Sequence, residues 1–361
     1  TVKRISSLPP VYAALAHSSS IAQNSLFAIR HSSLVTRHSK GFPMTKFAFF
    51  RGRIVPIHEA QISIMTHTFN YGTGCFGGIR AYWDVTRGEL NVFRIADHYR
   101  RFVQSASLMR GELHYSAEEL VAVTLDLLAQ ENWQEDAYIR PLAYKADEMI
   151  GVRTHGLTDE VAIFSVPMGD LLARGGIQAC VSSWRRVDDN AIPARGKIIG
   201  AYANSALVKS DAILSGFDEA IVLNQDGHVS EGSASNLMIL RNGVVVTPPV
   251  SSNILEGITR RTVMTLIEQE LGLPVQERQI DRSELYLADE AFFCGTGVQI
   301  APIATIDRRP VGNGAIGPIA QQLSDLFFRI VRNQEPTYAH WLTRVPRTGP
   351  TPTHQHANLQ S

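Results

Sequence analysis

Residues 188–202 read Asp-Asp-Asn-Ala-Ile-Pro-Ala-Arg-Gly-Lys-Ile-Ile-Gly-Ala-Tyr, a polar loop that ends at Lys197 and leads into a helix-forming segment. After residue 46 the chain has only two other lysines, Lys145 and Lys209. Lys145 follows an alternating, strand-like run and Lys209 lies within a helical pattern. A lysine is usually a solvated surface charge, but Lys197 is the one placed at the entrance of a helix, where it could serve a site.

Three further segments supply chemical partners for Lys197. Tyr202 follows it by five residues, Glu231 stands in Ser-Glu-Gly at 230–232, and Gly-Thr-Gly occupies 295–297. An amine can form a Schiff base, a carboxylate can pair with a pyridine nitrogen, and small-residue turns can receive a phosphate or a carboxylate. Together these residues predict a site for pyridoxal 5'-phosphate. The alternative for Glu231 is a surface charge beside a hairpin.

Length and composition predict an ordinary globular protein with two domains. The chain has 361 residues, 44% hydrophobic and 19% charged, and single cores seldom exceed about 250–300 residues. Its formal net charge of zero argues against nucleic-acid or membrane-surface partners. No apolar run approaches the ~20 residues of a membrane span. The three scattered cysteines fit neither a zinc motif nor a disulfide framework, so we expect no metal and a reducing compartment, the cytoplasm.

Hydrophobic periodicity predicts an α+β fold. In an N-terminal domain, 44–167, we expect a hairpin over 47–65 turning at 51–53, a helix near Asp97, a second helix capped by Ser116, and strands at 138–144 and 161–166. The glycine-rich segment 168–176 is the predicted linker between the two domains. In a C-terminal domain, 177–345, we expect strands at 177–183 and 219–224, hairpin turns at 226–227 and 242–243, and helices at about 202–215, 257–271 and 318–332.

Both ends of the chain are predicted to lie outside the folded core. Residues 1–46 contain no acidic residue and are rich in Ser, His, Arg and Ala, as organellar transit peptides are. Because Met44 precedes a strand-like opening, we favour upstream sequence translated from a misplaced start and treat 1–43 as a non-core extension. The polar, proline-containing tail, 346–361, is predicted to be disordered.

Six motifs, taken in order, resemble the branched-chain amino acid aminotransferases of the fold type IV (class IV) family. The resemblance runs from about Phe47 to Arg344, and its motifs are Tyr71–Arg80, Tyr138-Ile-Arg140-Pro, Lys197 with Tyr202, Ser230-Glu-Gly with Asn236, Leu255–Arg260 and Gly295-Thr-Gly297. It implies a smaller N-terminal α/β two-layer domain and a larger, barrel-like C-terminal α/β domain. It also implies ping-pong transfer of an amino group between leucine, isoleucine or valine and 2-oxoglutarate.

The same resemblance implies roles for individual residues. Lys197 would bind the cofactor and then act as the catalytic base. Glu231 would keep the cofactor's pyridine nitrogen protonated, and Tyr202 would form a hydrogen bond with the cofactor's phenolic oxygen. Phosphate contacts would come from Arg101, Ile258, Thr259 and Thr296. Substrate contacts would come from Tyr71, Phe76, Arg80, Tyr138, Arg140, Val152, Gly295, Thr296 and Gly297, with Arg140 and the glycine turn taking the α-carboxylate.

The resemblance also implies a homodimer, or a higher oligomer built from it. In this family the segment matching Ile150-Gly-Val152 reaches into the neighbouring subunit's site, and Ile150 and Met168 would add to the apolar wall of the pocket. The partners implied are therefore a second copy of the chain, amino acids and 2-keto acids.

Some positions depart from the family pattern or fit other functions. Gly77 stands where members usually have glutamate, which removes a charge beside the pocket; a need for positive φ is the alternative. The motif at 231–236 also resembles D-amino acid aminotransferases, and (R)-amine transaminases and aminodeoxychorismate lyases share the fold. Residues 72–77 satisfy the dinucleotide fingerprint of dehydrogenases, but 78–83 read as a strand where that motif needs a helix.

Overall fold

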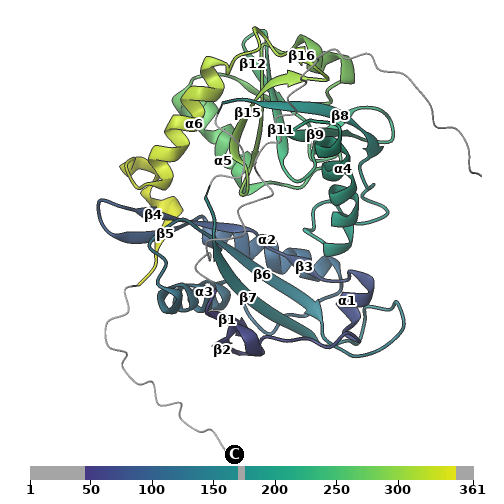
Figure 1. The fold of residues 1–361 in the computed structure, drawn as a ribbon, viewed down its shortest axis with the longest axis vertical. Coiled ribbons are helices and arrows are strands. Elements are labelled where there is room, and N and C mark those ends of the chain that lie inside the picture. The colour runs from purple at the N-terminus through teal and green to yellow at the C-terminus, as the bar shows by residue number, and fades with distance from the viewer. Residues whose placement is uncertain (1–44, 170–174, 347–361) are drawn as a thin grey trace, which may run out of the picture. The chain divides into compact units, whose positions relative to one another are not determined.

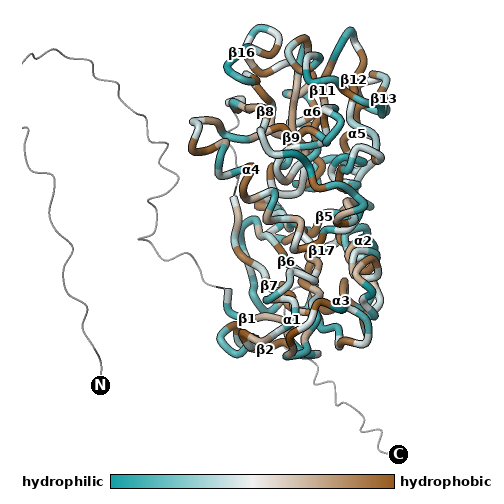
Figure 2. The backbone as a smooth tube through the Cα atoms, turned by 90° about the vertical axis from the view of Figure 1, so that its right-hand side faces the viewer, coloured by the Kyte–Doolittle hydropathy of each residue, from teal (hydrophilic) through white to brown (hydrophobic). Residues whose placement is uncertain are grey.

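The computed structural model describes residues 45–169 and 175–346. The predictions for 1–43, for the tail beyond residue 346 and for the middle of the linker lie outside these residues. The described strands form two sheets, one mainly from the N-terminal half of the chain and one from the C-terminal half (Figure 1). Hydrophobic stretches occur in both halves (Figure 2).

The first sheet is antiparallel, with the order β17-β5-β4-β6-β7-β1-β2 and β3 paired to β6. Its strands are β1 (Phe47–Phe50), β2 (Arg53–Pro56), β3 (Cys75–Phe76), β4 (Ile79–Asp84), β5 (Glu89–Phe93), β6 (Ala137–Lys145), β7 (Asp159–Pro167) and β17 (Leu342–Arg344). The helices of this half are α1 (His67–Tyr71), α2 (Ile95–Leu108) and α3 (Ala117–Glu131). Side chains of α2 and α3 share a buried core with β4, β5, β6 and β7.

Ser116 caps α3 as predicted. Its hydroxyl accepts from the Glu119 amide at 3.1 Å, and the Glu119 carboxylate accepts from the Ser116 amide at 2.8 Å. These reciprocal bonds satisfy amides that the first helical turn leaves free. A local sequence signal therefore positioned this helix correctly.

The N-terminal hairpin is shorter than predicted. Its strands end at Pro56, and a 3-10 helix covers Ile57–Glu59. Proline cannot donate to a ladder and suits an edge strand, and β2 is such an edge. The prediction for 57–65 was therefore wrong: Ile62 is 49% exposed and Ile64 80% exposed instead of packing as strand residues.

The second sheet is mixed, with the order β10-β9-β8-β15-β14-β11-β12-β13 and β16 paired to β15. Its strands are β8 (Ile177–Arg185), β9 (Glu219–Leu223), β10 (Val229–Gly232), β11 (Asn236–Arg241), β12 (Val244–Thr247), β13 (Val275–Glu277), β14 (Glu290–Gly295), β15 (Gln299–Ile306) and β16 (Arg309–Pro310). The helices are α4 (Tyr202–Leu214), α5 (Ile258–Glu270) and α6 (Pro318–Val331), with 3-10 turns at Ile199–Ala201, Arg282–Leu287 and Pro336–Trp341.

Both faces of this second sheet are buried. Phe292 packs with α5 and α6, whereas its neighbour Phe293 lies in a separate core with Leu237 and Ile221, and all four side chains have no exposed surface. Successive side chains of a strand point to opposite faces. One face is therefore covered by helices while the other encloses its own core, as expected for the barrel-like half.

Candidate active site

A cavity of about 490 Å³ contains most of the predicted site residues. The half of the chain with the first sheet contributes Phe76, Gly78, Arg101, Tyr138, Arg140, Leu142 and Met168 to its lining. The half with the second sheet contributes Arg186, Lys197, Ile199, Tyr202, Glu231, residues 233–236, Leu255, residues 257–259 and residues 294–297. Residues that are more than 200 positions apart in the sequence therefore share one space.

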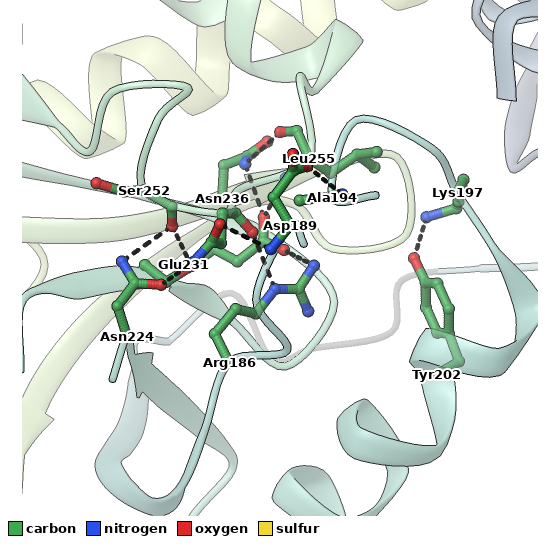
Figure 3. Close-up of polar contacts among 12 residues, drawn as sticks. Arg186, Asp189, Ala194, Lys197, Tyr202, Asn224, Glu231, Asn236, Ser252 and Leu255 are labelled. Atoms are coloured by element: carbon green, nitrogen blue, oxygen red, sulfur yellow. Dashed lines mark hydrogen bonds and ion pairs between the residues drawn. The ribbon is translucent and has the colours of Figure 1, made fainter. Parts of the chain in front are cut away.

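Lys197 faces Tyr202 in this cavity. Its Nζ donates a hydrogen bond to the Tyr202 hydroxyl at 2.5 Å (Figure 3) and lies 4.9 Å from the centre of the Phe76 ring. Burial, and then the nearby positive charge of Arg101, lower the pKa of Lys197 to about 8. Burial also raises the pKa of Tyr202 to about 12. Near neutral pH an appreciable fraction of the amine is therefore unprotonated and able to act as a nucleophile or base.

The other two candidate lysines form ion pairs outside the cavity. Lys145 is almost fully buried, and its Nζ lies 2.8 Å from an oxygen of Asp159. Lys209 lies 2.9 Å from an oxygen of Glu219. Of the lysines in the described ranges, Lys197 is the one that lines the cavity.

The Glu231 carboxylate is held by three donors (Figure 3). Arg186 forms an ion pair with it at 2.7 Å, Asn236 donates to it through Nδ2 at 3.0 Å, and the Leu255 amide donates at 3.2 Å. Burial raises the pKa of Glu231, and the charge of Arg186 opposes that rise. The surface-charge alternative for Glu231 is therefore wrong, because this carboxylate lies in the cavity and is 3% exposed.

One part of the cavity is suited to an anion. α5 begins there at Ile258 after Gly257, with no side chain capping its N-terminus, so its first amides and the positive end of its dipole are available. Arg101 lies in the same lining, donating to the Glu256 carbonyl at 3.2 Å, and burial lowers its pKa to about 10. Thr259 and Thr296 also line the cavity.

Strand β6 supplies a second cationic group. Tyr138, Arg140 and Leu142 all line the cavity, because alternate residues of a strand share one face. The Arg140 guanidinium lies 4.5 Å from the centre of the Phe76 ring and donates to the Tyr138 hydroxyl at 3.0 Å. Its buried Nε has no hydrogen-bond partner among the described residues. This group is available for a further acceptor.

Comparison with known proteins identifies the family. The family model described as amino-transferase class IV matches residues 74–306, which is more than half of the chain. The chain belongs to the class IV aminotransferase family.

Relatives of this class IV aminotransferase carry one recurrent name. The chain is 50% identical over 307 residues to the "Probable branched-chain-amino-acid aminotransferase" of Aquifex aeolicus, covering 85% of this chain and 98% of that protein. It is 40% identical, with a TM-score of 0.80, to the branched-chain amino acid aminotransferase of Thermobaculum terrenum in its PLP (holo) form, covering 84% and 99%. A further solved enzyme of the same name, complexed with N-(5'-phosphopyridoxyl)-L-glutamate, is 37% identical with a TM-score of 0.80, covering 84% and 99%.

Three predicted substrate residues of the aminotransferase do not line the cavity. The Tyr71 hydroxyl accepts from the Gly151 amide at 3.0 Å, and Val152 is 77% exposed. Arg80 is buried and donates to the carbonyls of Met168, Gly169 and Gly297 at 3.2, 2.7 and 3.3 Å. Arg80 thus holds the backbone around the cavity, whereas Tyr71 is half-buried against Gly151 and Val152 lies at the surface.

Gly77 also lies outside the cavity lining of the aminotransferase. A Cβ at this position would lie 2.5 Å from Cγ of Pro141, and Gly77 does not adopt a positive φ. The alternative based on positive φ is therefore wrong. Glycine fits here because it has no Cβ, and any other residue would have to displace the Pro141 ring.

Sequence reasoning missed Arg186 as a partner of Glu231. Arg186 follows β8 directly, and its Nε donates to the Asn253 carbonyl at 3.0 Å. An arginine after a strand carries no pairing signal, since its partner is 45 residues away. The dinucleotide alternative is contradicted, because residues 79–84 form β4 and not the helix that the motif needs.

Residues 45–169 and 175–346 contain no group of three or more His, Cys, Asp or Glu side chains placed to bind a metal ion. The helices in the same ranges are too short or too polar to span a bilayer.

Proposed function

We propose that this chain is a pyridoxal phosphate-dependent aminotransferase that exchanges the amino group between leucine, isoleucine or valine and 2-oxoglutarate. The observation that carries the proposal is a lysine with a lowered pKa that faces Tyr202 in the same cavity as a buried, triply hydrogen-bonded carboxylate. The names of the relatives support the branched-chain class of substrate.

The charges and unpaired polar groups of the cavity suit this cofactor. Arg101, the amides at the start of α5, and Thr296 would hold the phosphate, and the buried Ser235 hydroxyl, which has no partner among the described residues, offers one more donor. Glu231 would bind the protonated ring nitrogen and Tyr202 the phenolic oxygen. When bound, the cofactor supplies a carbonyl group that reacts with amines and a ring that accepts electrons.

Lys197 would then move the proton. With its amine free, Lys197 would act as the base that takes a proton from the substrate α-carbon and as the acid that gives the proton back later in the reaction. A pKa of about 8 places this base near the operating pH, where general base catalysis is most effective. Arg186 and Asn236 would keep Glu231 ionised and oriented.

The substrate side combines cationic and apolar groups. Arg140 and the turn at 295–297 would receive carboxylates, and Phe76, Leu142 and Met168 would contact a branched side chain. Because one cavity contains both kinds of group, the branched-chain amino acid and the dicarboxylic acceptor would bind in the same place, one after the other. Such alternating binding supports a ping-pong mechanism. The solved relative in complex with a phosphopyridoxyl derivative of glutamate supports glutamate as the second amino acid.

A homodimer is part of the proposal. Large apolar side chains are exposed on two segments: Ile62, Ile64, Met65 and Phe69, and Ile150 and Val152. The segments lie side by side, since the His67 amide donates to the Asp147 carbonyl at 2.9 Å and the Gly151 amide bonds Tyr71. Contiguous apolar surface of this kind marks interaction sites, and a second copy would cover it.

The test is a substrate panel. Purified, cofactor-loaded protein is incubated with L-amino acids, D-amino acids or (R)-amines in the presence of 2-oxoglutarate, and glutamate formation is measured. We expect the highest kcat/KM with L-leucine, L-isoleucine and L-valine, and parallel lines in double-reciprocal plots. Preferential use of D-amino acids or (R)-amines would reject the substrate class, and intersecting lines would reject the ping-pong order.

A further inference from the structure

Ser105 joins two residues of the proposed cofactor site. It lies on α2 and is 1% exposed. Its hydroxyl donates to the Arg101 carbonyl at 2.8 Å and accepts from the Lys197 amide at 3.2 Å. A serine hydroxyl has one donor hydrogen, and here that donor and one acceptor site are both used.

The backbone of Lys197 is fixed on both of its polar groups. Its amide donates to Ser105, and its carbonyl accepts from the Phe76 amide at 3.0 Å. A β-bridge between Cys75 and Ile198 and a bond from the Ile199 amide to the Gly74 carbonyl at 2.9 Å extend this pairing. The 72–76 segment thus holds one edge of the backbone around Lys197, and the opposite contact comes from the Ser105 side chain.

We propose that Ser105 is a positioning residue that holds the Lys197 amine in its reactive orientation toward Tyr202 and at a set separation from Arg101. The inference rests on the proposed function of Lys197. It follows from the two hydrogen bonds, because a hydroxyl bonded to the backbones of both Arg101 and Lys197 keeps these residues from separating. Arg101 is the largest charge effect that lowers the pKa of Lys197, so the separation influences reactivity as well as geometry.

A purely structural role is the alternative. Serines in helices often bond the carbonyl four residues earlier with little consequence, and the bond to Arg101 is of that kind. The bond from Lys197 is different, since it spans 92 residues and reaches another element. The alternative predicts a loss of stability only, whereas positioning predicts a change in the chemistry of Lys197.

The experiment compares Ser105→Ala, Ser105→Cys and Ser105→Thr with Ser107→Ala as the control. Cysteine nearly preserves the volume but bonds weakly, threonine retains the hydroxyl, and Ser107 is a serine of the same helix whose hydroxyl bonds only the Gln104 carbonyl among the contacts described. The readouts are kcat and KM for L-leucine, the cofactor dissociation constant, and the pH dependence of acetic anhydride labelling of Lys197 in the cofactor-free protein, followed by mass spectrometry.

We expect Ser105→Ala and Ser105→Cys to lower kcat about tenfold, with little change in KM. A tenfold loss is the rate effect expected from the free energy of about one hydrogen bond. Labelling should reach half its maximum near pH 8 in the wild type and at higher pH in both variants, because an amine that moves away from Arg101 and into water is easier to protonate. Ser105→Thr should recover part of kcat, and Ser107→Ala should match the wild type.

Two results would reject the positioning role. In one, Ser105→Ala and Ser105→Cys lose thermal stability but keep the wild-type kcat and labelling profile, which identifies Ser105 as structural. In the other, Ser107→Ala produces the same losses as the Ser105 variants. Failure of the proposed function looks different, because the wild-type protein would then show no borohydride-stable attachment of pyridoxal phosphate to Lys197.

Discussion

Lys197 differs from Lys145 and Lys209 in the side chain that its amine contacts. The Nζ atom of each of the other two lysines lies within 3 Å of a carboxylate oxygen, so each is engaged in an ion pair. Lys197 contacts a phenol instead, and its pKa falls to about 8. Burial alone would not identify the reactive lysine, since Lys145 is the more deeply buried residue.

Replacing Lys197 by alanine should abolish both cofactor attachment and turnover. The visible absorbance of the bound cofactor disappears and kcat falls by about 10²- to 10⁴-fold or more, because the base is lost. Lys209→Ala, which removes the lysine paired with Glu219 outside the cavity, serves as the control and should retain both properties. An unchanged spectrum and rate in Lys197→Ala would place the attachment at another lysine.

Glu231→Gln should separate cofactor binding from catalysis. The amide retains the shape of the side chain but loses the charge that keeps the ring nitrogen protonated, so half-reaction rates fall by about 10²- to 10³-fold while cofactor still binds. Stopped-flow absorbance with L-leucine measures this loss. The control is Glu219→Gln, a buried carboxylate paired with Lys209. Normal half-reaction rates in Glu231→Gln would show that another group keeps the ring nitrogen protonated.

Gly77→Glu tests the departure from the family pattern. From the sequence, Gly77 was expected to remove a charge beside the pocket, but it lies outside the cavity lining and a Cβ at this position meets Pro141. The main effect should therefore be displacement of the Pro141 ring, with a loss of stability of about 1–3 kcal/mol from overpacking. The measurements are thermal unfolding and the ratio of kcat/KM for an (R)-amine to that for leucine. A changed ratio at unchanged stability would assign Gly77 to specificity.

At the scale of elements, the ends of helices and the faces of strands present the site. The N-terminus of α5 offers free amides, Tyr202 begins α4, and alternation along β6 presents Tyr138, Arg140 and Leu142 on one face. These elements formed where periodicity and turn residues predicted them. Element type was predictable because capping and alternation depend on neighbours within about four positions.

Removal of the α3 cap should lower stability without affecting catalysis. In Ser116→Ala the hydroxyl that accepts from the Glu119 amide is lost, which costs about 1 kcal/mol and lowers Tm by about 2–4 °C. Differential scanning calorimetry measures the shift, and kcat and KM for leucine should stay at wild-type values. A fall in kcat at temperatures well below Tm would contradict a purely local role for this cap.

At the scale of the whole molecule, the proposed dimer explains why large apolar side chains are exposed on the segments 62–69 and 150–152. The hairpin prediction had assigned Ile62 and Ile64 to a strand, but they lie on the surface with Phe69 and Val152. An apolar surface of this extent is more readily covered by a second copy of the chain than left in contact with water.

Phe69→Asp and Ile64→Asp should dissociate that dimer. A carboxylate buried without a partner in an apolar interface costs several kcal/mol, so the dimer dissociation constant should rise by at least about 100-fold. Analytical ultracentrifugation measures it, with Leu214→Asp as the control, since Leu214 on α4 is also an apolar residue that is mostly exposed. A wild-type monomer, or dissociation by the control alone, would reject this interface.

The sequence by itself determined the kinds of most elements, although not the end of the hairpin at 57–65. It also determined the order of the motifs and the candidate lysine, tyrosine and carboxylate of the site. Those signals lie within single segments, so no distant contact is needed to recognise them. Only the tertiary structure decided which partner each group has: Arg186 with Glu231, Pro141 against Gly77, Arg80 behind the glycine turn, and Ser105 between Arg101 and Lys197. Each of these contacts joins residues 45 or more positions apart, with the exception of the bond from Ser105 to Arg101. Such contacts depend on how the chain packs, which local propensities and spacing do not specify.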